Sequence, residues 1–567
     1  MSFFASEFGP SPILFSILEF HMPENSDPRE SPGVERPTAT ALEPAKKSAE
    51  SFRPEDAELV FGVAYAAGTY IEPIVEALKD YIRRFGYLPQ EVRISEYIRK
   101  RLKIEVSDNS EADRIESLIK GGNQICRDTK RKDFLVLATV AEIAEHREQE
   151  ADGSPKPRPR TAYIVRSLKR PEETATLRQI YHPGFYQISV FASEDERLKY
   201  LTERKGVEPG RAKSILDKDQ REQDDEYGQR TRDTFHRADV FIEGPSELKR
   251  FLDLIFGEPF TTPNRDEYAM FMAASASLRS SQYGRQVGAA ITDELGEILA
   301  LGCNDVPKSG GGLYWSDDKD PRRDHERTPA TDSNDEAKFE IEQEVISRFS
   351  GVVDSAVDQA VRQIGQGLIA TKLKEIFLKE LRLMPGALRN TKIFEITEYG
   401  RAVHAEMNAL LNCASAGVSP KGGTLFTTAF PCHNCTRHII AAGISRVVYI
   451  EPYPKSRAVD LHGDAIRLGK NEERREDGAT GAESRIPFVP FVGIGPRRFL
   501  DLFSVDLSSG YPLERKNDGG KVSWSPARNR GPRTPLLPSS YLDRELGAVR
   551  EEHESVRQDG EGTNARS

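Results

Sequence analysis

The sequence has few cysteines, no excess of positive charge and no long apolar run, and each absence narrows the class of protein. Its 567 residues include five cysteines, at positions 126, 303, 413, 432 and 435. An odd and sparse set does not build a disulfide framework, so the chain is expected to be cytoplasmic. The 80 basic residues are outnumbered by 90 acidic ones, which gives a formal net charge of −10. This balance provides no general attraction to nucleic acid.

A signal peptide and a membrane span are not expected either. Residues 1–22 are moderately apolar, but they lack a basic start and contain Glu7 and Glu19. Their apolar stretch is too short to cross a bilayer. The segment 1–55, rich in Pro, Ser and Glu after residue 22, is expected to be disordered, and so is the Gly-, Arg-, Glu- and Pro-rich segment 505–567. Two folded domains remain, 56–258 and 263–504.

Strand and helix patterns alternate in the first domain. Residues 58–64 are apolar after Glu58 and are typical of a buried strand, and the apolar positions of 71–82 recur at helical spacing. This alternation predicts an α/β fold with a mainly parallel sheet, covered by helices on both faces as in nucleotide kinases. The charged run 217–232 is expected to be a solvated face or a mobile lid. Further strands are predicted at 161–165, 185–191 and 238–242, with a helix from Pro171.

The turn after the first strand resembles a phosphate-binding loop but lacks its lysine. In a P-loop, backbone N–H groups cradle phosphate and a Lys adds charge. Here Gly62 and Gly68 are six residues apart, Thr69 follows directly, and Tyr65 stands between the glycines. One interpretation is an active kinase or ATPase. The other, which the missing Lys favours, is a degenerate P-loop domain that senses nucleotide through Gly62, Gly68 and Thr69, or mediates assembly.

The strongest chemical signal is a His-x-Glu sequence followed by Pro-Cys-x-x-Cys. His404, Cys432 and Cys435 supply one imidazole and two thiols, which is the ligand set of a catalytic zinc site with an open fourth position. Glu406 is placed to move protons between an activated water and a substrate. The signature is typical of zinc nucleobase deaminases. The sequence therefore predicts Zn²⁺ as cofactor and Glu406 as the catalytic residue.

A closed structural zinc site is the alternative interpretation. It requires His433 or His438 as a fourth ligand, and a C-x-x-C pair alone would also suit a redox motif. The placement of Glu406 favours the catalytic interpretation, so both histidines are expected to pack around the site.

The patterns on either side of the motif predict an α/β/α domain. A helix at 264–278 and a hairpin with strands at 285–291 and 297–301 come first, which is the order of a cytidine-deaminase core. Segment 308–400 is then inserted, either as a device that shapes substrate access or as a packing extension. Within the insertion, helices are predicted near 335–349, 352–364 and 368–382. After the zinc helix, strands are predicted at 424–428 and 446–450.

With these residues in view, the chain resembles the deoxycytidylate branch of the cytidine deaminase superfamily. More closely, it looks like the bacterial anti-phage dCTP deaminases, which join a P-loop kinase-like domain to a C-terminal deaminase domain. The resemblance implies zinc on the His-Cys-Cys set, Glu406 as proton shuttle, a sugar-hydroxyl contact from Asn304 and a homo-oligomer. It is carried by Gly302-Cys303-Asn304-Asp305-Val306-Pro307-Lys308, Val403-His404-Ala405-Glu406, Pro431-Cys432-His433-Asn434-Cys435 and Glu451-Pro452-Tyr453-Pro454-Lys455-Ser456.

The predicted function is hydrolytic deamination of a free deoxycytidine nucleotide, dCTP and/or dCMP, with antiviral nucleotide depletion implied by the resemblance. Arg285, Lys308 and Lys455 are candidate phosphate contacts because they lie near the motifs, although each also fits a surface charge. Asn304 alone also fits a turn. Two other functions stay open: a regulatory protein that only binds nucleotide, and an editor of polynucleotides. The second is disfavoured because no basic aromatic groove lies near the motifs.

Overall fold

The computed structural model describes residues 56–564, apart from 103–109, 146, 149–154, 221–224, 328–329, most of 365–397, 452–455, 470–484 and 536–537. The predicted disordered segment 1–55 lies outside these residues. Within the described ranges, no helix is both long and apolar enough to cross a membrane.

A parallel sheet forms the N-terminal half, as the alternating pattern predicts. Its strands lie in the order β5-β4-β1-β3-β2. The chain first adds strands on one side of β1 and then crosses to the other side, so strand order reverses at β1. The strands are β1 (Leu59–Tyr65), β2 (Leu88–Arg93), β3 (Thr161–Leu168), β4 (Phe185–Val190) and β5 (Val240–Ile242).

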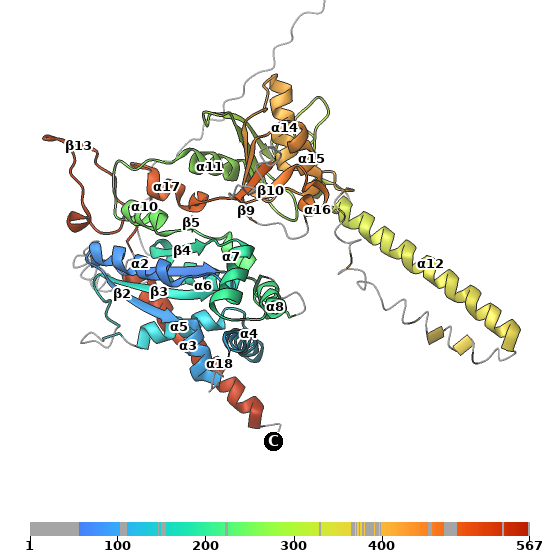
Figure 1. Ribbon diagram of the computed structural model, residues 1–567, viewed down its shortest axis with the longest axis horizontal. Helices are drawn as coiled ribbons and strands as arrows, with labels where there is room; N and C mark the ends of the chain where they lie inside the picture. Colours follow the sequence, from blue (N-terminus) through green and yellow to red (C-terminus); the bar gives the residue numbers. More distant parts are fainter. Residues whose placement is uncertain are drawn as a thin grey trace, which may run out of the picture. The chain divides into compact units, whose positions relative to one another are not determined.

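Alternating side chains of β1 enter two apolar cores, one on each face of this sheet. Leu59, Phe61 and Val63 belong to one core, and Val60 and Ala64 to the other. This is the two-residue period of a strand that is buried on both faces. Figure 1 shows helices on both faces. They are α2 (Glu72–Arg84) and α10 (Pro245–Ile255) on one face, and α3 (Ile94–Leu102), α4 (Glu111–Asp128), α5 (Phe134–Glu145) and α6 (Pro171–Tyr181) on the other.

A strand from much later in the chain completes this sheet. β12 (Gly493–Ile494) pairs antiparallel with β5, and α17 (Phe499–Phe503) buries Phe499, Leu502 and Phe503 in the core that also contains residues of α10. The predicted domain boundary at 504 therefore differs from the structure, because residues from 493 onward belong to the N-terminal half. Sequence patterns could not show this, since a two-residue strand has no periodicity of its own.

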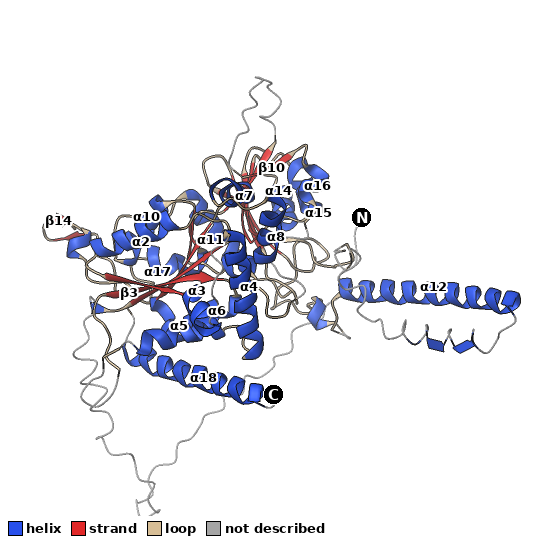
Figure 2. Ribbon diagram, turned by 60° about the horizontal axis from the view of Figure 1, so that its bottom comes forward, coloured by secondary structure: helices blue, strands red, loops and turns tan. Residues whose placement is uncertain are grey.

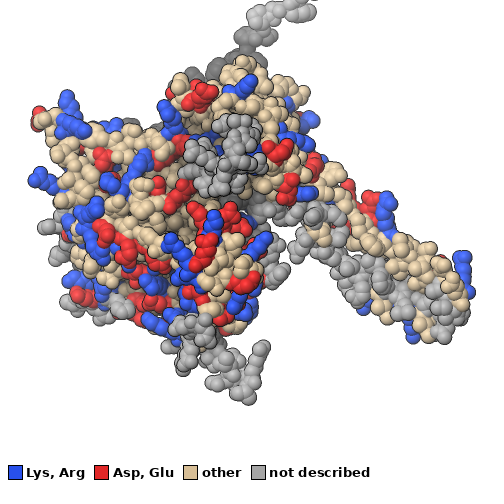
Figure 3. Space-filling view, viewed as in Figure 1, with Lys and Arg blue, Asp and Glu red and all other residues tan. Residues whose placement is uncertain are grey.

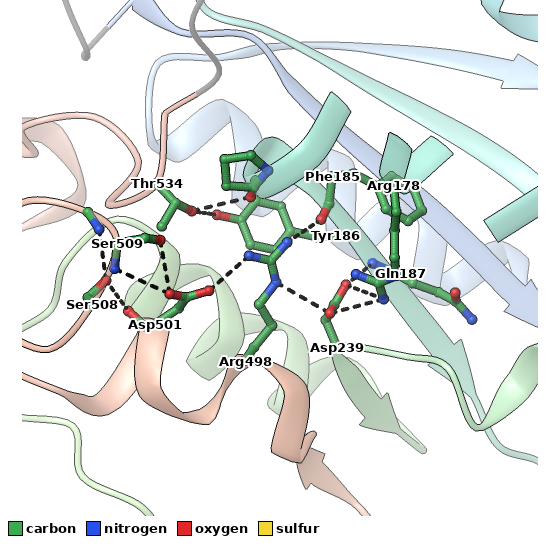
Figure 4. Close-up of polar contacts among 12 residues, drawn as sticks. Arg178, Phe185, Tyr186, Gln187, Asp239, Arg498, Asp501, Ser508, Ser509 and Thr534 are labelled. Atoms are coloured by element: carbon green, nitrogen blue, oxygen red, sulfur yellow. Dashed lines mark hydrogen bonds and ion pairs between the residues drawn. The ribbon is translucent and has the colours of Figure 1, made fainter. Parts of the chain in front are cut away.

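Arg498 fixes this late segment to the sheet. Its side chain is buried, and its guanidinium carbon lies 4.8 Å from the centre of the Tyr186 ring. The guanidinium donates to the carbonyl oxygen of Phe185 at 2.6 Å and pairs with Asp239 at 3.3 Å (Figure 4). Asp239 also accepts the backbone N–H of Gln187 at 2.7 Å. The buried positive charge is therefore paired and hydrogen-bonded, as burial of a charge requires.

The C-terminal segment also returns to the N-terminal half. α18 (Pro538–Asn564) lies along α5, as Figure 2 shows. Arg147 bridges Glu58 at 2.8 Å and Glu545 of α18 at 2.6 Å, and each of the three side chains is 1% exposed. The predicted disorder of 505–567 is thus wrong for α18. That prediction used composition, whereas this helix is held by contacts with distant residues: Tyr541 and Ala548 pack in the core, and Glu545 pairs with Arg147.

The C-terminal half is built on a mixed sheet in the order β10-β11-β9-β8-β6-β7. The β6–β7 hairpin and the β6–β8 pair are antiparallel, and the remaining pairs are parallel. The strands are β6 (Gly288–Thr292), β7 (Ile298–Cys303), β8 (Thr424–Ala429), β9 (Arg446–Glu451), β10 (Ile466–Leu468) and β11 (Ile486–Pro490).

Helices cover both faces of this sheet and give the predicted α/β/α layers. α11 (Arg265–Ser277) packs on one face, and α14 (Ala405–Ala416) with α15 (His433–Ala441) packs on the other. Two glycines permit this close packing. A Cβ at Gly288 would lie 1.9 Å from the carbonyl oxygen of Ala273, and one at Gly302 would lie 2.2 Å from that of Ala405.

The insertion contains α12 (Ser333–Ile364), one continuous helix where two were predicted, at 335–349 and 352–364. The helix runs through Gly351, a residue that costs about 1 kcal/mol in a helix but does not end it. The third predicted helix, 368–382, lies mostly outside the described residues. On the face drawn in Figure 3, acidic and basic side chains are interspersed.

Candidate active site

The N-terminal ends of α14 and α15 meet at the predicted metal ligands. His404 is the N-cap of α14, and Cys432 is the N-cap of α15, where its Sγ accepts the N–H of Cys435 at 3.4 Å. The unpaired N–H groups and the helix dipole at these ends favour negatively charged groups such as thiolates. Pro431 directly precedes the N-cap of α15.

The three predicted ligands form a compact cluster. His404 Nδ1 lies 3.3 Å from the Sγ of Cys432 and 3.3 Å from the Sγ of Cys435. A tetrahedral zinc ion keeps a bound nitrogen and sulfur about 3.5 Å apart, from the usual Zn–N and Zn–S bond lengths. All three ligand atoms lie within 4.8 Å of one another. Both the spacing and the donor atoms therefore fit Zn²⁺.

The carboxylate of Glu406 lies beside this cluster. Glu406 is in the first turn of α14, is 4% exposed, and has its Oε2 3.5 Å from the Sγ of Cys435. Burial raises the pKa of Glu406 above its ordinary value. A hydrogen bond from Cys435 lowers the pKa of Cys432 to about 4. The side chains thus combine a thiolate, which suits metal binding, with a carboxyl suited to holding a proton.

His433 and His438 do not join the cluster. Among the described residues, the metal-ligand group contains His404, Cys432 and Cys435 alone. His433 instead directs its Nε2 toward Glu398, at 3.5 Å. A closed structural site with either histidine as fourth ligand therefore lacks support in the described structure, which agrees with the catalytic interpretation.

Two residues that the sequence did not single out hold the first turn of α14 in place. Asn408 accepts the N–H of Cys303 at 3.2 Å and ties the helix to the end of β7. Asp305 is fully buried, accepts the N–H of Ser281 at 3.2 Å, and receives the N–H of Val403 on its carbonyl oxygen at 3.0 Å. The sequence did contain one signal for Asn408: it is a polar residue among apolar ones on the buried face of α14.

The predicted substrate contacts have intramolecular partners. Asn304 accepts the N–H of Val287 at 2.7 Å and donates to the carbonyl oxygen of Arg285 at 2.8 Å, so its amide shapes the backbone before β6. One N–H of that amide is left for a ligand. Arg285 pairs with Glu451, and Lys308 pairs with Asp318. Lys455 lies outside the described residues.

The three predicted nucleotide-binding residues of the N-terminal half are not all brought together. Gly62 lies inside β1, where a Cβ would meet the side chains of Leu168 and Phe185 at 2.6 and 2.8 Å. Gly68 has a φ of +80°, which favours glycine. Gly68 and the buried Thr69 line a cavity at the carboxyl end of β1, and Gly62 does not.

Comparison with known proteins identifies similar sequences for the C-terminal half. Residues 263–451 match the model of the cytidine and deoxycytidylate deaminase zinc-binding region. ComE operon protein 2 of Bacillus subtilis (strain 168) is 47% identical over 53 residues, which are 9% of this chain and 28% of that protein. The deoxycytidylate deaminase of Enterobacteria phage T2 is 42% identical over 55 residues, which are 10% and 29% of the two chains. The matches thus span less than a third of these relatives.

Among solved structures, the dCMP deaminase of cyanophage S-TIM5 is similar in its apo form and in complex with dCMP and dUMP. The apo form is 16% identical, with a TM-score of 0.20, and the match covers 40% of this chain and 99% of that one. The complex is 20% identical, with a TM-score of 0.20, and the match covers 35% and 91%. The segment with the His404, Cys432 and Cys435 cluster therefore matches the zinc-binding region of the cytidine and deoxycytidylate deaminases.

Proposed function

We propose that this protein hydrolyses the exocyclic amine of a free deoxycytidine nucleotide. Water adds at C4 of the cytosine ring, the bond from C4 to the amine breaks, and the products are a deoxyuridine nucleotide and ammonia. The observation that carries the proposal is the buried carboxyl group of Glu406, 3.5 Å from the thiol of Cys435 in a cluster that fits zinc. The match of residues 263–451 to the deaminase zinc-binding region supports the same chemistry.

The three metal ligands and Glu406 have different tasks in this reaction. His404, Cys432 and Cys435 hold the zinc ion, which when bound supplies the Lewis acidity that activates water near neutral pH. Glu406 takes a proton at its carboxylate as the attacking water adds to C4. It gives this proton to N3 of the ring, then takes the second proton from the hydroxyl group on C4 and passes it to the leaving amine. Burial raises the pKa of Glu406 and so favours the protonated form, which is the form that donates to the ring and to the amine.

Replacing Glu406 by Gln tests the proposal. The amide keeps the shape of the side chain but cannot carry the proton, so kcat for ammonia release should fall roughly 10²–10⁴-fold. Zinc content should stay at one ion per chain, because Glu406 does not belong to the ligand set. The matched control is Glu398→Gln, which changes a half-exposed carboxylate near His433 and should keep its activity. Full activity in Glu406→Gln would refute the assigned role.

The identity of the substrate calls for a separate assay. We propose dCMP and dCTP as substrates: deoxycytidylate deaminases among the similar proteins support the first, and the resemblance to anti-phage dCTP deaminases supports the second. Purified protein would be incubated with dCMP, dCDP, dCTP, CMP and CTP, and the uracil products measured. Bound zinc without turnover of any of these nucleotides would favour a regulatory binding protein instead.

The biological role and assembly are further proposals that rest on the same resemblance. Deamination would deplete deoxycytidine nucleotides during phage infection, and the protein would act as a homo-oligomer. Cells that express the protein should lose dCTP after infection, whereas cells that express Glu406→Gln should retain it. The mass of the purified protein in light scattering tests the oligomer.

A further inference from the structure

A cavity of about 410 Å³ lies at the carboxyl end of the N-terminal sheet, remote in sequence from the zinc cluster. All of its lining residues fall between Tyr65 and Gln229. They come from the ends of β1, β2 and β3 and from the helices that follow. Strand order reverses at β1, and ligands of open α/β sheets bind in the crevice outside such a reversal. The volume lies in the usual range of small-molecule sites.

Positive charge predominates in the lining, in contrast to the net charge of the chain. Four carboxylates line the cavity: Glu72, Glu111, Glu173 and Asp219. Six cationic side chains stand against them: Arg93, Arg114, Arg166, Lys169, Arg170 and Lys205. The formal excess is two positive charges, which matches the charge of one phosphate monoester near neutral pH.

One of these carboxylates already occupies the turn that resembles a phosphate-binding loop. Asp219 is 1% exposed and accepts the N–H of Ala67 at 2.7 Å. It also pairs with Lys169 at 2.8 Å. The carboxylate thus takes the position that a phosphate would need on this N–H, and it neutralises the nearest lysine. Asp219 lies in the run 217–232, predicted as a solvated face or mobile lid, and its burial contradicts that prediction here. Arg93 and Arg166 pair with Glu91, outside the lining, and Arg170 pairs with Glu173. An anionic ligand is therefore expected at Arg114 and Lys205, the other two cations of the lining.

Two buried side chains in the lining have hydrogen-bonding atoms without a protein partner. Thr69 and Gln229 are each 8% exposed, and the Thr69 hydroxyl and the Gln229 carbonyl oxygen make no hydrogen bond within the described structure. Leaving a buried polar atom unsatisfied costs about 1–3 kcal/mol, so such atoms normally have a partner. Both residues line the same cavity, so a polar ligand bound there can supply the missing partners.

The remaining wall is apolar and suits a ring. Ile94 and Ile98 of α3, Ile115 and Leu118 of α4, and Leu135 of α5 line this side. A free inorganic anion would leave this surface in contact with water. An organic group attached to the anion would cover it, with a gain that grows with the area buried.

We propose that this cavity binds a nucleoside monophosphate, as a second ligand site distinct from the zinc cluster. Arg114 and Lys205 face the phosphate, Thr69 and Gln229 hydrogen-bond the nucleoside, and the apolar wall packs on its base. The side chain of Arg114 is 38% exposed and pairs with Glu111 at 2.6 Å. Because it is partly exposed, it can turn toward an incoming anion without unfolding its surroundings. The proposal is independent of the deaminase activity.

Calorimetric titration of the full-length zinc protein tests this site. The probes are AMP, UMP and dTMP, with adenosine, uridine, thymidine and inorganic phosphate as their separate parts. At least one monophosphate should bind once per chain, and its nucleoside and inorganic phosphate should each bind at least about tenfold more weakly, because each lacks half of the contacts. Absence of binding by all three monophosphates overturns the proposal, and so does equal binding of inorganic phosphate alone.

Variants then assign the binding to this cavity. Arg114→Gln should weaken binding of the monophosphate about tenfold, the usual effect of losing a charge-assisted hydrogen bond. Thr69→Val keeps the shape of the side chain, tolerates burial and should weaken binding about fivefold. The matched control is Lys100→Gln, which changes a 72% exposed cation of α3 outside the cavity and should bind like wild type. Unchanged affinity in Thr69→Val and in folded Arg114→Gln would place the ligand elsewhere and overturn the proposal.

Discussion

Replacing Gly302 by Ala should impair the proposed deamination, although Gly302 is neither a metal ligand nor the proposed proton carrier. Gly302 lies in β7 under the first turn of α14, the turn that carries Glu406 and begins at the ligand His404. An added Cβ would lie 2.2 Å from the carbonyl oxygen of Ala405 and 2.5 Å from the N–H nitrogen of Ala409. Both obstructing atoms are backbone atoms, so a change of rotamer cannot relieve the contact.

The size of the effect follows from the displacement that the new methyl group requires. To reach the 3.0 Å that real Cβ contacts keep, the carbonyl of Ala405 has to move by about 0.8 Å relative to β7. A displacement near 1 Å of reacting groups costs on the order of 10²-fold in rate. Overpacking of this kind lowers the free energy of unfolding by about 1–3 kcal/mol, so the variant should still fold.

The assay compares kcat/KM for dCMP, zinc content and melting temperature in the wild type and in Gly302→Ala. The control is Gly351→Ala in α12, where an added Cβ meets nothing within 4 Å. That variant should keep its activity, and α12 should gain up to about 1 kcal/mol in helix propensity. Wild-type kcat/KM in a folded Gly302→Ala protein would show that close packing of α14 on β7 does not position the catalytic turn.

Two other perturbations address the buried charges and the metal. Arg147→Met leaves Glu58 and Glu545 buried without their cation, and should cost about 3–5 kcal/mol, or roughly 6–20 °C in melting temperature for a domain of this size. Arg530→Met, at an exposed ion pair, should cost less than about 1 kcal/mol in the same thermal unfolding experiment, and equal losses would contradict the assigned burial. Removal of zinc by a chelator should abolish deamination and destabilise the C-terminal half, by about 2.7 kcal/mol relative to protein in zinc at a hundredfold its Kd. Zinc but not magnesium should restore both, since thiolates bind zinc in preference to hard cations, and recovery in magnesium alone would argue against the thiolate site.

The zinc ligands and Glu406 were predictable because the motif places them at short, fixed separations in the sequence. His404 and Glu406 are two residues apart, and Cys432 and Cys435 are three apart, so each pair is fixed by a single helix end. The main strands were predictable for a related reason, since a run such as 59–65 is apolar over its whole length. Patterns of this kind depend only on neighbours in the chain.

The features that sequence patterns missed depend on contacts between distant residues. α18 has few apolar residues, but Tyr541 and Ala548 are buried in the core of the first sheet, and Glu545 pairs with Arg147 at 2.6 Å. Asp219 stands in a charged run, yet it is buried because the turn after β1 offers it an N–H. The hydrogen-bond partners of Asn304, which hold its amide against the backbone before β6, could not be predicted from the sequence either. None of these contacts leaves a periodic trace in the sequence.

The return of β12 and α18 to the first sheet has a consequence for synthesis on the ribosome. Multidomain chains generally fold from the N-terminus, each domain closing soon after it emerges. Here β5 gains its neighbour β12 from a segment translated about 250 residues later, and Arg147 gains its partner Glu545 398 residues later. The half that is translated first is therefore finished last, after the zinc-binding half has already left the exit tunnel.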